Sequence, residues 1–324
     1  MKASQLTLAI LLTAAFGSAY AVEVQGDSSN TKAIKVGSSS LIPFGAGRAG
    51  IAISNAADGN YSFSVNLENG PARRIRDKYG RTPINGGNQN VNVNGAANPR
   101  YLTPSDVNPV LGWFSSEKLG QVWYEKRANN TEVFSVRQMA ELSEKGLLKK
   151  APKFGGMTFA KVPTAATNVF FGEWAPRKNG TAPENSTDLN MGSSQRTVWY
   201  VGENPARNLS NMTISKATYN VVGINNHTPG RNDFYTGQVT ADFGSKAVMG
   251  GSISRDDKDT LTFKDVSINL RNGTFTSTGT TNKEGITGQF YGTNAAALAG
   301  YATRGNGVGD DVAFGGKQSS STPK

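Results

Sequence analysis

Any chemistry in this chain has to be done with one histidine and no cysteine. The histidine, His227, lies in the polar segment Gly-Ile-Asn-Asn-His-Thr-Pro-Gly at 223–230. A cysteine nucleophile is excluded, and one histidine cannot supply the two-histidine zinc motifs, although a serine–histidine pairing stays open. The sequence contains no Walker loop, nucleotide fingerprint or carboxylate-rich calcium loop. We therefore expect a binding protein that is not an enzyme and that has no metal site.

The charge balance of the chain is basic, with 34 Lys and Arg against 24 Asp and Glu and a formal net charge of +10. Such a chain can be attracted to acidic membranes, nucleic acid or an acidic protein. The basic residues are mostly dispersed, which favours a role in solubility, and we expect no nucleic-acid partner. One cluster stands out as a candidate docking patch, and it consists of Arg73, Arg74, Arg76, Lys78 and Arg81.

The first 21 residues have the pattern of a secretory signal. Lys2 precedes an apolar core at 6–16, and Ala-Tyr-Ala at 19–21 provides small residues for cleavage. The mature chain is expected to begin at Val22. Because no cysteine is present, neither a lipid anchor at a cysteine nor a disulfide can form. The sequence therefore predicts a secreted, extracellular protein without a lipid anchor.

The mature chain is long enough for two domains, and residues 22–190 are expected to form the first, a mixed α+β domain. Strand-like segments are expected at 41–44, 51–54, 61–67, 122–124, 133–134, 157–162 and 169–174. Ser135, three residues before Gln138, suggests a capping box and predicts a helix that ends near Gly146. The polar segment 177–194 predicts the domain boundary.

The second domain is expected at 195–316 and consists of short strands joined by tight turns. The strands are expected at 197–201, 217–222, 233–241, 247–254, 261–263, 266–270, 274–278, 286–291, 301–303 and 312–314. Arg-Asn-Gly at 271–273 predicts a type I′ hairpin turn. Repeated hairpins with one apolar face favour a closed antiparallel β-barrel of about eight strands, so the fold class is mainly β. Residues 317–324 are expected to be a disordered tail.

Two motifs in the chain resemble those of a known group of proteins. Gly-Gln-Phe-Tyr-Gly at 288–292, followed by Thr-Asn-Ala-Ala-Ala-Leu-Ala-Gly at 293–300, resembles the closing strands of the small barrel in transferrin-binding protein B, factor H-binding protein and the hemophilins. Val-Phe-Phe-Gly-Glu-Trp at 169–174 is similar to a hemophilin segment at the end of the first domain. The resemblance implies a handle domain on an eight-stranded barrel. It also implies export by a surface lipoprotein assembly modulator (Slam) of a Gram-negative bacterium.

Resemblance to the hemophilins further implies a secreted hemophore that takes haem from host haemoglobin for iron acquisition and delivers it to a TonB-dependent outer-membrane receptor. In that family the haem is associated with the handle and is held by histidine, whereas the handle of this chain contains none. Three alternatives stay open: ligation by His227, ligation by a tyrosinate, or no haem. The tyrosine candidates are Tyr61, Tyr79 and Tyr101. The competing hypothesis is a secreted host-protein-binding or colonisation factor without haem.

Overall fold

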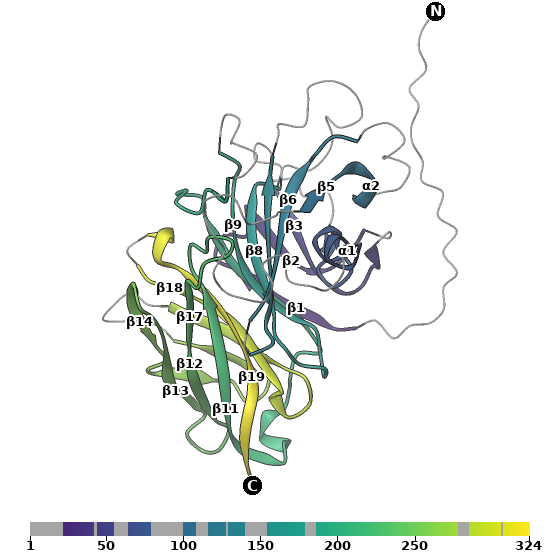
Figure 1. Ribbon diagram of the computed structural model, residues 1–324. Coiled ribbons are helices and arrows are strands. Elements are labelled where there is room, and N and C mark those ends of the chain that lie inside the picture. Colours follow the sequence, from purple (N-terminus) through teal and green to yellow (C-terminus); the bar gives the residue numbers. More distant parts are fainter. Residues whose placement is uncertain are drawn as a thin grey trace, which may run out of the picture.

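A computed structural model describes residues 22–41, 44–54, 64–78, 100–107, 116–127, 129–139, 154–178, 186–277, 285–305 and 307–324. The described chain forms two β-rich domains that pack against each other (Figure 1). We call the domain up to Glu203 the handle and the domain from Leu209 the barrel. The predicted signal sequence lies outside the described residues, and none of the described helices is long and apolar enough to cross a membrane.

The handle is built on a seven-stranded antiparallel sheet with the order β1-β10-β9-β8-β7-β6-β5. Six consecutive strands, β5 to β10, lie in chain order in this sheet through antiparallel pairings, and β1 extends it beyond β10. The strands span Val24–Ser28 (β1), Arg100–Leu102 (β5), Gly120–Lys126 (β6), Glu132–Gln138 (β7), Gly156–Lys161 (β8), Val169–Ala175 (β9) and Thr197–Glu203 (β10).

One face of the handle sheet is covered by a second, three-stranded sheet and a short helix. The small sheet contains Ile34–Ser38 (β2), Ala49–Ile53 (β3) and Val65–Asn66 (β4), and the helices are Pro71–Lys78 (α1) and Pro104–Val107 (α2). Ile34 and Ile51 from the small sheet and Ile75 from α1 belong to one apolar core with Phe159 and Trp199 of the large sheet. Burial of these side chains holds the two layers together.

The barrel is closed by eight antiparallel strands, as the hairpin pattern predicts. The ring runs β11-β12-β13-β15-β16-β17-β18-β19 and returns to β11, while β14 forms a hairpin with β13. The strands are Ile214–Ile224 (β11), Phe234–Asp242 (β12), Val248–Arg255 (β13), Lys258–Thr262 (β14), Val266–Ile268 (β15), Thr274–Thr276 (β16), Gly285–Tyr291 (β17), Ala297–Thr303 (β18) and Val312–Pro323 (β19). Short 3₁₀ turns span Leu209–Asn211 (η3), Thr293–Ala295 (η4) and Val308–Asp310 (η5).

Two glycines of the barrel motif make room for aromatic rings inside the barrel. Gly288 in β17 lies opposite Gly300 in β18. A Cβ atom at Gly288 would lie 2.2 Å from Cζ of Phe275, and one at Gly300 would lie 2.8 Å from Cζ of Phe314. Because those distances are shorter than any normal contact, only glycine lets both rings fill the barrel interior.

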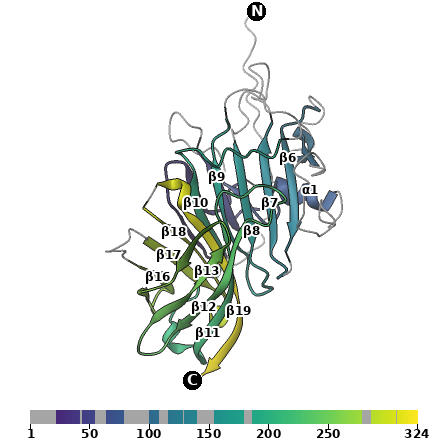
Figure 2. The same ribbon diagram turned by 60° about the vertical axis from the view of Figure 1, so that its left-hand side comes forward.

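The outer face of the barrel packs against the free face of the handle sheet. Their shared apolar core includes Phe171 and Tyr200 from the handle and Tyr291 from the barrel. The hydroxyl of Tyr291 donates to the carbonyl of Gln25 at 2.9 Å, which adds a polar contact between the domains. Figure 2 shows β18 and β19 running beside β9 and β10.

The structure corrects one expectation about the handle, the helix predicted to begin at Ser135. Residues 135–138 do not start a helix, because they belong to β7, which pairs with β6 and β8 on either side. The strand pairings outweigh the local capping pattern. The longer of the two helices in the described part of the handle, α1, follows Gly70 and begins at Pro71, which suits the first turn of a helix. Met139 lies next to β7, and residues 140–150 lie outside the described residues.

Three expectations about the second domain are also corrected. The strand at 197–203 belongs to the handle sheet, where it pairs with β9, so the change of domain follows Glu203 rather than the polar segment before Gln195. Residues 317–323 continue β19, which pairs with β11 as far as Pro323, and therefore do not form a disordered tail. In the turn at 270–273, Gly273 N–H donates to the carbonyl of Asn269 at 2.9 Å and Gly273 alone has positive φ. This is a four-residue loop, not a type I′ turn.

Candidate functional site

The loop at 225–233, between β11 and β12, carries His227 and lies where the barrel meets the handle. The side chain of His227 is completely buried. Its Nδ1 atom bonds with the carboxylate of Asp233 in the same loop, and its Nε2 atom lies 3.3 Å from Oε1 of Glu125 in β6 of the handle. The ring also packs on Phe234, with ring centroids 4.4 Å apart. Both ring nitrogens are thus occupied by carboxylates, one from each domain.

The backbone of the same loop is held by handle carboxylates. Glu173 in β9 accepts the N–H groups of Asn226 and His227 at 2.8 and 2.7 Å. Oε1 of Glu125 accepts the N–H of Gly230 at 2.7 Å. Because Asn226 has a left-handed backbone (φ 52°), the chain turns sharply enough to point successive N–H groups at one carboxylate. The handle therefore holds the loop through backbone N–H groups of the loop as well as through the side chain of His227.

The charge of Glu173 is compensated inside the protein by Arg196. The guanidinium Nε and Nη2 atoms lie 2.8 and 2.5 Å from Oε2 of Glu173, and both side chains are completely buried. Nη2 of Arg196 also donates to the carbonyl of Asp311 at 2.8 Å, and Nη1 donates to the carbonyl of Val308. These carbonyls lie in η5 and directly before β19, so this charge pair also joins the handle to the barrel.

The two carboxylates around His227 change its acidity. Burial alone lowers the pKa of His227, but hydrogen bonds to Asp233 and Glu125 and their charges outweigh burial and raise the pKa to about 9. The reciprocal effect holds for Asp233: burial raises the pKa of this carboxyl, but the hydrogen bond and charge of His227 dominate and bring it below its usual value. His227 is therefore an imidazolium at neutral pH.

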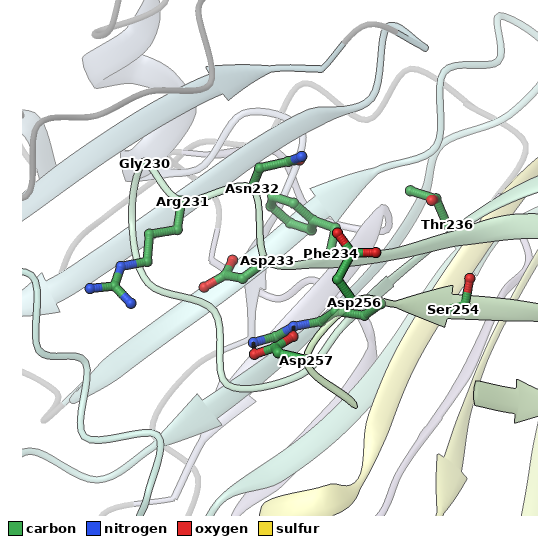
Figure 3. A pocket seen from close by; sticks show the side chains of 10 residues that line it. Gly230, Arg231, Asn232, Asp233, Phe234, Thr236, Ser254, Asp256 and Asp257 are labelled. Carbon is green, nitrogen blue, oxygen red and sulfur yellow. Dashed lines mark hydrogen bonds and ion pairs between the residues drawn. The ribbon is translucent and has the colours of Figure 1, made fainter. Parts of the chain in front are cut away.

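The loop lines an open, polar hollow of about 510 Å³ (Figure 3). The guanidinium of Arg255 closes one side, where it bonds with Asp257 at 2.5 and 2.8 Å and donates to the carbonyl of Asn225 at 2.6 Å. The lining residues are Gly230, Arg231, Asn232, Asp233, Phe234, Thr236, Ser254, Arg255, Asp256 and Asp257. With one aromatic ring among charged and polar groups, the hollow suits a polar group better than a flat apolar ring.

Two of the four candidate haem ligands, Tyr101 and His227, lie in the described part of the chain. Tyr61 and Tyr79 lie outside the described residues. Tyr101 in β5 is half-buried, and the ammonium of Lys118 lies 4.1 Å from the centre of its ring. His227 has no ring nitrogen left for iron in this conformation, because Asp233 and Glu125 occupy both. The described geometry therefore speaks against His227 as the iron ligand.

Two of the five residues in the predicted basic docking patch are buried. Arg73 and Arg76 lie three positions apart on α1 and are buried against the handle sheet. Arg76 pairs with Glu132 at 2.5 Å, and Arg73 pairs with Glu68 at 2.9 Å. The guanidinium of Arg76 also lies 5.7 Å from the centre of the Phe134 ring. These arginines anchor the helix to the sheet, so they are not available to a partner.

The remaining members of that cluster behave differently. Arg74 lies over the ring of Phe44 at 4.2 Å, and the half-exposed Lys78 pairs with Asp106 of α2 at 3.1 Å. Arg81 lies outside the described residues. In the part of the chain that the structure describes, no group of three or more histidine, cysteine or acidic side chains is placed to hold a metal ion.

Sequence reasoning missed the handle residues that surround His227. Glu125 follows Val-Trp-Tyr in a strand, and Glu173 interrupts the apolar run Val-Phe-Phe-Gly-Glu-Trp. A carboxylate in a fully buried strand needs a compensating partner. That requirement is a usable signal that Glu173 contacts a cation, but the sequence does not reveal that Arg196 is this cation or that the loop of His227 is nearby.

The barrel is similar to a domain of a known family. A family model described as the HphA C-terminal domain matches residues 210–318, which extend from η3 into β19. The motif at 288–300 lies inside this match, so the hemophilin resemblance of the barrel is confirmed.

Two solved structures match this chain at low sequence identity. The haemoglobin receptor HpuA from Kingella denitrificans is 13% identical, with 95% of this chain and 90% of HpuA covered and a TM-score of 0.45. A double mutant of transferrin-binding protein B from Haemophilus parasuis is 16% identical, with a TM-score of 0.33. That comparison covers 63% of this chain and 39% of the transferrin-binding protein.

Proposed function

We propose that this chain is a secreted protein that binds haem or haemoglobin and supports iron acquisition, as a hemophilin does. The observation that supports the proposal is the match of residues 210–318 to the HphA C-terminal domain. The segment at 169–174, which is similar to a hemophilin segment, adds support from the handle. The family match covers the barrel, so the ligand of the handle is the part that experiment has to establish.

Haem is the cofactor that the resemblance implies, and the described residues fit it poorly. Removing His227 from its carboxylates to ligate iron would leave Glu125 and Asp233 without their buried cation. Tyr101, half-buried in β5 of the handle, is the other described candidate, and tyrosinate is a known haem ligand. The proposal therefore does not depend on iron ligation by His227.

Export and delivery are further parts of the proposal. The secretory pattern at 1–21 and the barrel resemblance support release through a Slam-type modulator, and a TonB-dependent outer-membrane receptor would take up the cargo. Deleting the modulator in the producing bacterium should trap the protein in the periplasm. Equal amounts in the medium with and without the modulator would contradict this route.

The decisive test uses the mature chain from Val22. Immobilised protein is exposed to haemoglobin, and free protein is titrated with ferric haem while the Soret band is followed. We expect haemoglobin capture, a stoichiometric Soret shift, or both. Denatured protein and the same titration in buffer serve as controls for nonspecific haem adsorption. Neither capture nor a spectral shift beyond these controls would overturn the proposal.

A second candidate function follows from the occupied histidine. If the chain binds a host protein without haem, His227 has a structural role alone, and its contacts with Asp233 and Glu125 support that role. In that case the purified protein is colourless and captures a host protein whether or not haem is present. Capture of haem-free globin with an affinity equal to that of haemoglobin would favour this alternative.

A further inference from the structure

The contact between His227 and its two carboxylates places the imidazole of the chain's single histidine between the handle and the barrel. Glu125 belongs to β6 of the handle, and Asp233 belongs to the barrel loop that carries His227 itself. The side chain of His227 is completely buried, and those of Glu125 and Asp233 are 8% and 12% exposed. Water therefore cannot replace either contact at low cost.

We propose that His227 is a proton-linked lock between the two domains: its protonated ring holds Glu125 and Asp233 together, and loss of the proton releases the loop at 225–233 and the hollow that this loop lines. The proposal concerns the joint between the domains and is independent of what the handle binds. It assigns the histidine a conformational role.

Hydrogen-bond chemistry supports the charged form of the ring. A neutral imidazole donates from one nitrogen and carries a lone pair on the other, whereas an imidazolium donates from both. Here both nitrogens face carboxylate oxygens, Nδ1 facing Asp233 and Nε2 facing Glu125. In either neutral tautomer the lone pair of one ring nitrogen would point at a carboxylate oxygen, and the two groups would repel each other. The protonated ring therefore fits this position, and the neutral ring does not.

Other charged groups around the ring do not replace its charge. Glu173 faces the loop from β9, but Arg196 already compensates it. On the side of Glu125, Nη1 of Arg127 lies 3.7 Å from Oε2, while Oε1 faces His227 and Gly230. The charge of Arg255 from β13 acts on Asp233, but its guanidinium bonds with Asp257 and Asn225. Deprotonation of His227 therefore leaves a net negative, closely packed group at the joint.

The loop depends on this lock at several points. Asp233 accepts the N–H of Thr228 at 3.0 Å in addition to its bond with His227. Glu125 accepts the N–H of Gly230 with the same oxygen that faces His227. If the ring loses its proton, one of these two acceptors faces a lone pair and is repelled, and the loop loses that anchor. The residues from Gly230 to Phe234 line the hollow, so release of the loop changes the shape of the hollow.

The raised pKa of about 9 agrees with this geometry and sets the pH at which the lock opens. The lock is closed at neutral pH and opens as the pH rises through about 9. Below neutral pH the ring stays charged. The lock is therefore expected to hold throughout the acidic and neutral range in which both carboxylates remain ionised.

The test exploits the fact that His227 is the single histidine of the chain. In tag-free protein labelled with ¹³C-histidine, one ring signal reports the protonation of His227 directly between pH 5 and pH 10.5. We expect a midpoint near pH 9, well above the value of about 6.5 for an unperturbed histidine. A midpoint at or below about 6.5 would overturn the proposal without any substitution being made.

A second measurement tests whether the loop follows the proton. Because the chain has no cysteine, Arg231→Cys gives a single nitroxide label on the exposed part of the loop. Its electron paramagnetic resonance spectrum should show a growing mobile component with the same midpoint as the ring signal. A label at Gln238→Cys, exposed on β12, is the matched control and should not change. An unchanged loop label while the ring titrates would overturn the proposal.

The variant His227→Gln adds a third arm. Glutamine can donate hydrogen bonds but has no charge, so the loop label should already be mobile at pH 7.5 and independent of pH. A loop that stays rigid in this variant would contradict the lock. If the variant does not fold, the two measurements with the native histidine still decide the question.

Discussion

The carboxylate of Glu173 in the handle accepts the backbone N–H of His227 in the barrel at 2.7 Å. Glu173 is completely buried and is neutralised by Arg196, so one charge pair in the handle organises a loop of the other domain. The two domains are therefore joined by polar contacts as specific as those inside either core. This relationship makes Glu173 the first residue to test.

The substitution Glu173→Gln should lower the free energy of unfolding by about 3 kcal/mol, because it leaves the guanidinium of Arg196 buried without its counter-charge. Chemical denaturation at pH 7 measures the loss. Asp188→Asn is the control, since Asp188 forms an exposed pair with Lys178 and should change stability by less than about 0.5 kcal/mol. Equal stabilities for Glu173→Gln and the native chain would contradict this account.

The glycine pair of the barrel motif supports a second prediction. Gly288→Ala should destabilise the protein by roughly 1–3 kcal/mol, because the new methyl group overlaps the ring of Phe275. The smaller Phe275→Leu should recover part of the loss in the double variant. Gly250→Ala is a matched control in β13, where a Cβ atom meets no other atom within 4 Å. The measurement is the melting temperature of the native chain, Gly288→Ala, Gly250→Ala and the double variant with Phe275→Leu. It shows whether the overlap with the ring or the loss of glycine itself lowers stability.

The packing between the domains predicts how the barrel behaves alone. A fragment at 207–324 should show β-type circular dichroism and cooperative melting, because its ring of strands is complete. It should melt below the full chain, since Tyr291 and other residues of the outer face lose their handle contacts. Extending the fragment to Gln195 adds β10 without β1 and β9, its partners in the handle sheet, so the extension should restore only a small part of this loss. A fragment that remains unfolded would refute the independence of the barrel.

The sequence predicted those parts of the fold that depend on local alternation and turns. The barrel follows from repeated hairpins, and the aromatic strand at 169–174 is β9 of the handle. The prediction of a helix from Ser135 was wrong because β6 and β8 pair with that segment from both sides. The predicted position of the domain boundary was wrong because β10 has a composition like that of a barrel strand. Its pairing with β9 assigns it to the handle.

The candidate site was predictable only in part. Scarcity of histidine drew attention to His227, and its loop does carry the site. Its partner Glu125 lies 102 positions away in the sequence, and contacts over that distance leave no local pattern. The arginines of α1 looked like a surface patch because charge runs are usually solvated, but their acidic partners, Glu68 and Glu132, lie outside the run.

The acidity of His227 predicts a specific pH dependence of stability. The folded pKa of about 9 lies above the unfolded value of about 6.5, so the native state binds more protons than the unfolded state between these values. The stabilisation is complete below about pH 6.5 and is lost as the pH rises through about 9. It amounts to about 3 kcal/mol. Urea denaturation from pH 6 to pH 10 measures it, and His227→Gln should abolish this slope. A wild-type chain with equal stability at pH 6 and pH 9.5 would contradict the prediction.

The occupied ring of His227 leads to a final prediction about haem. If the mature chain binds ferric haem, His227→Gln should leave the position and intensity of the Soret band unchanged, because iron ligation would require the ring to leave Asp233 and Glu125. Tyr101→Phe is the informative comparison, since it removes the phenolic oxygen of a described candidate and keeps its ring. Loss of the band in Tyr101→Phe alone would identify a tyrosinate ligand. Loss of the band in a folded His227→Gln protein would show that the histidine leaves its carboxylates to bind iron.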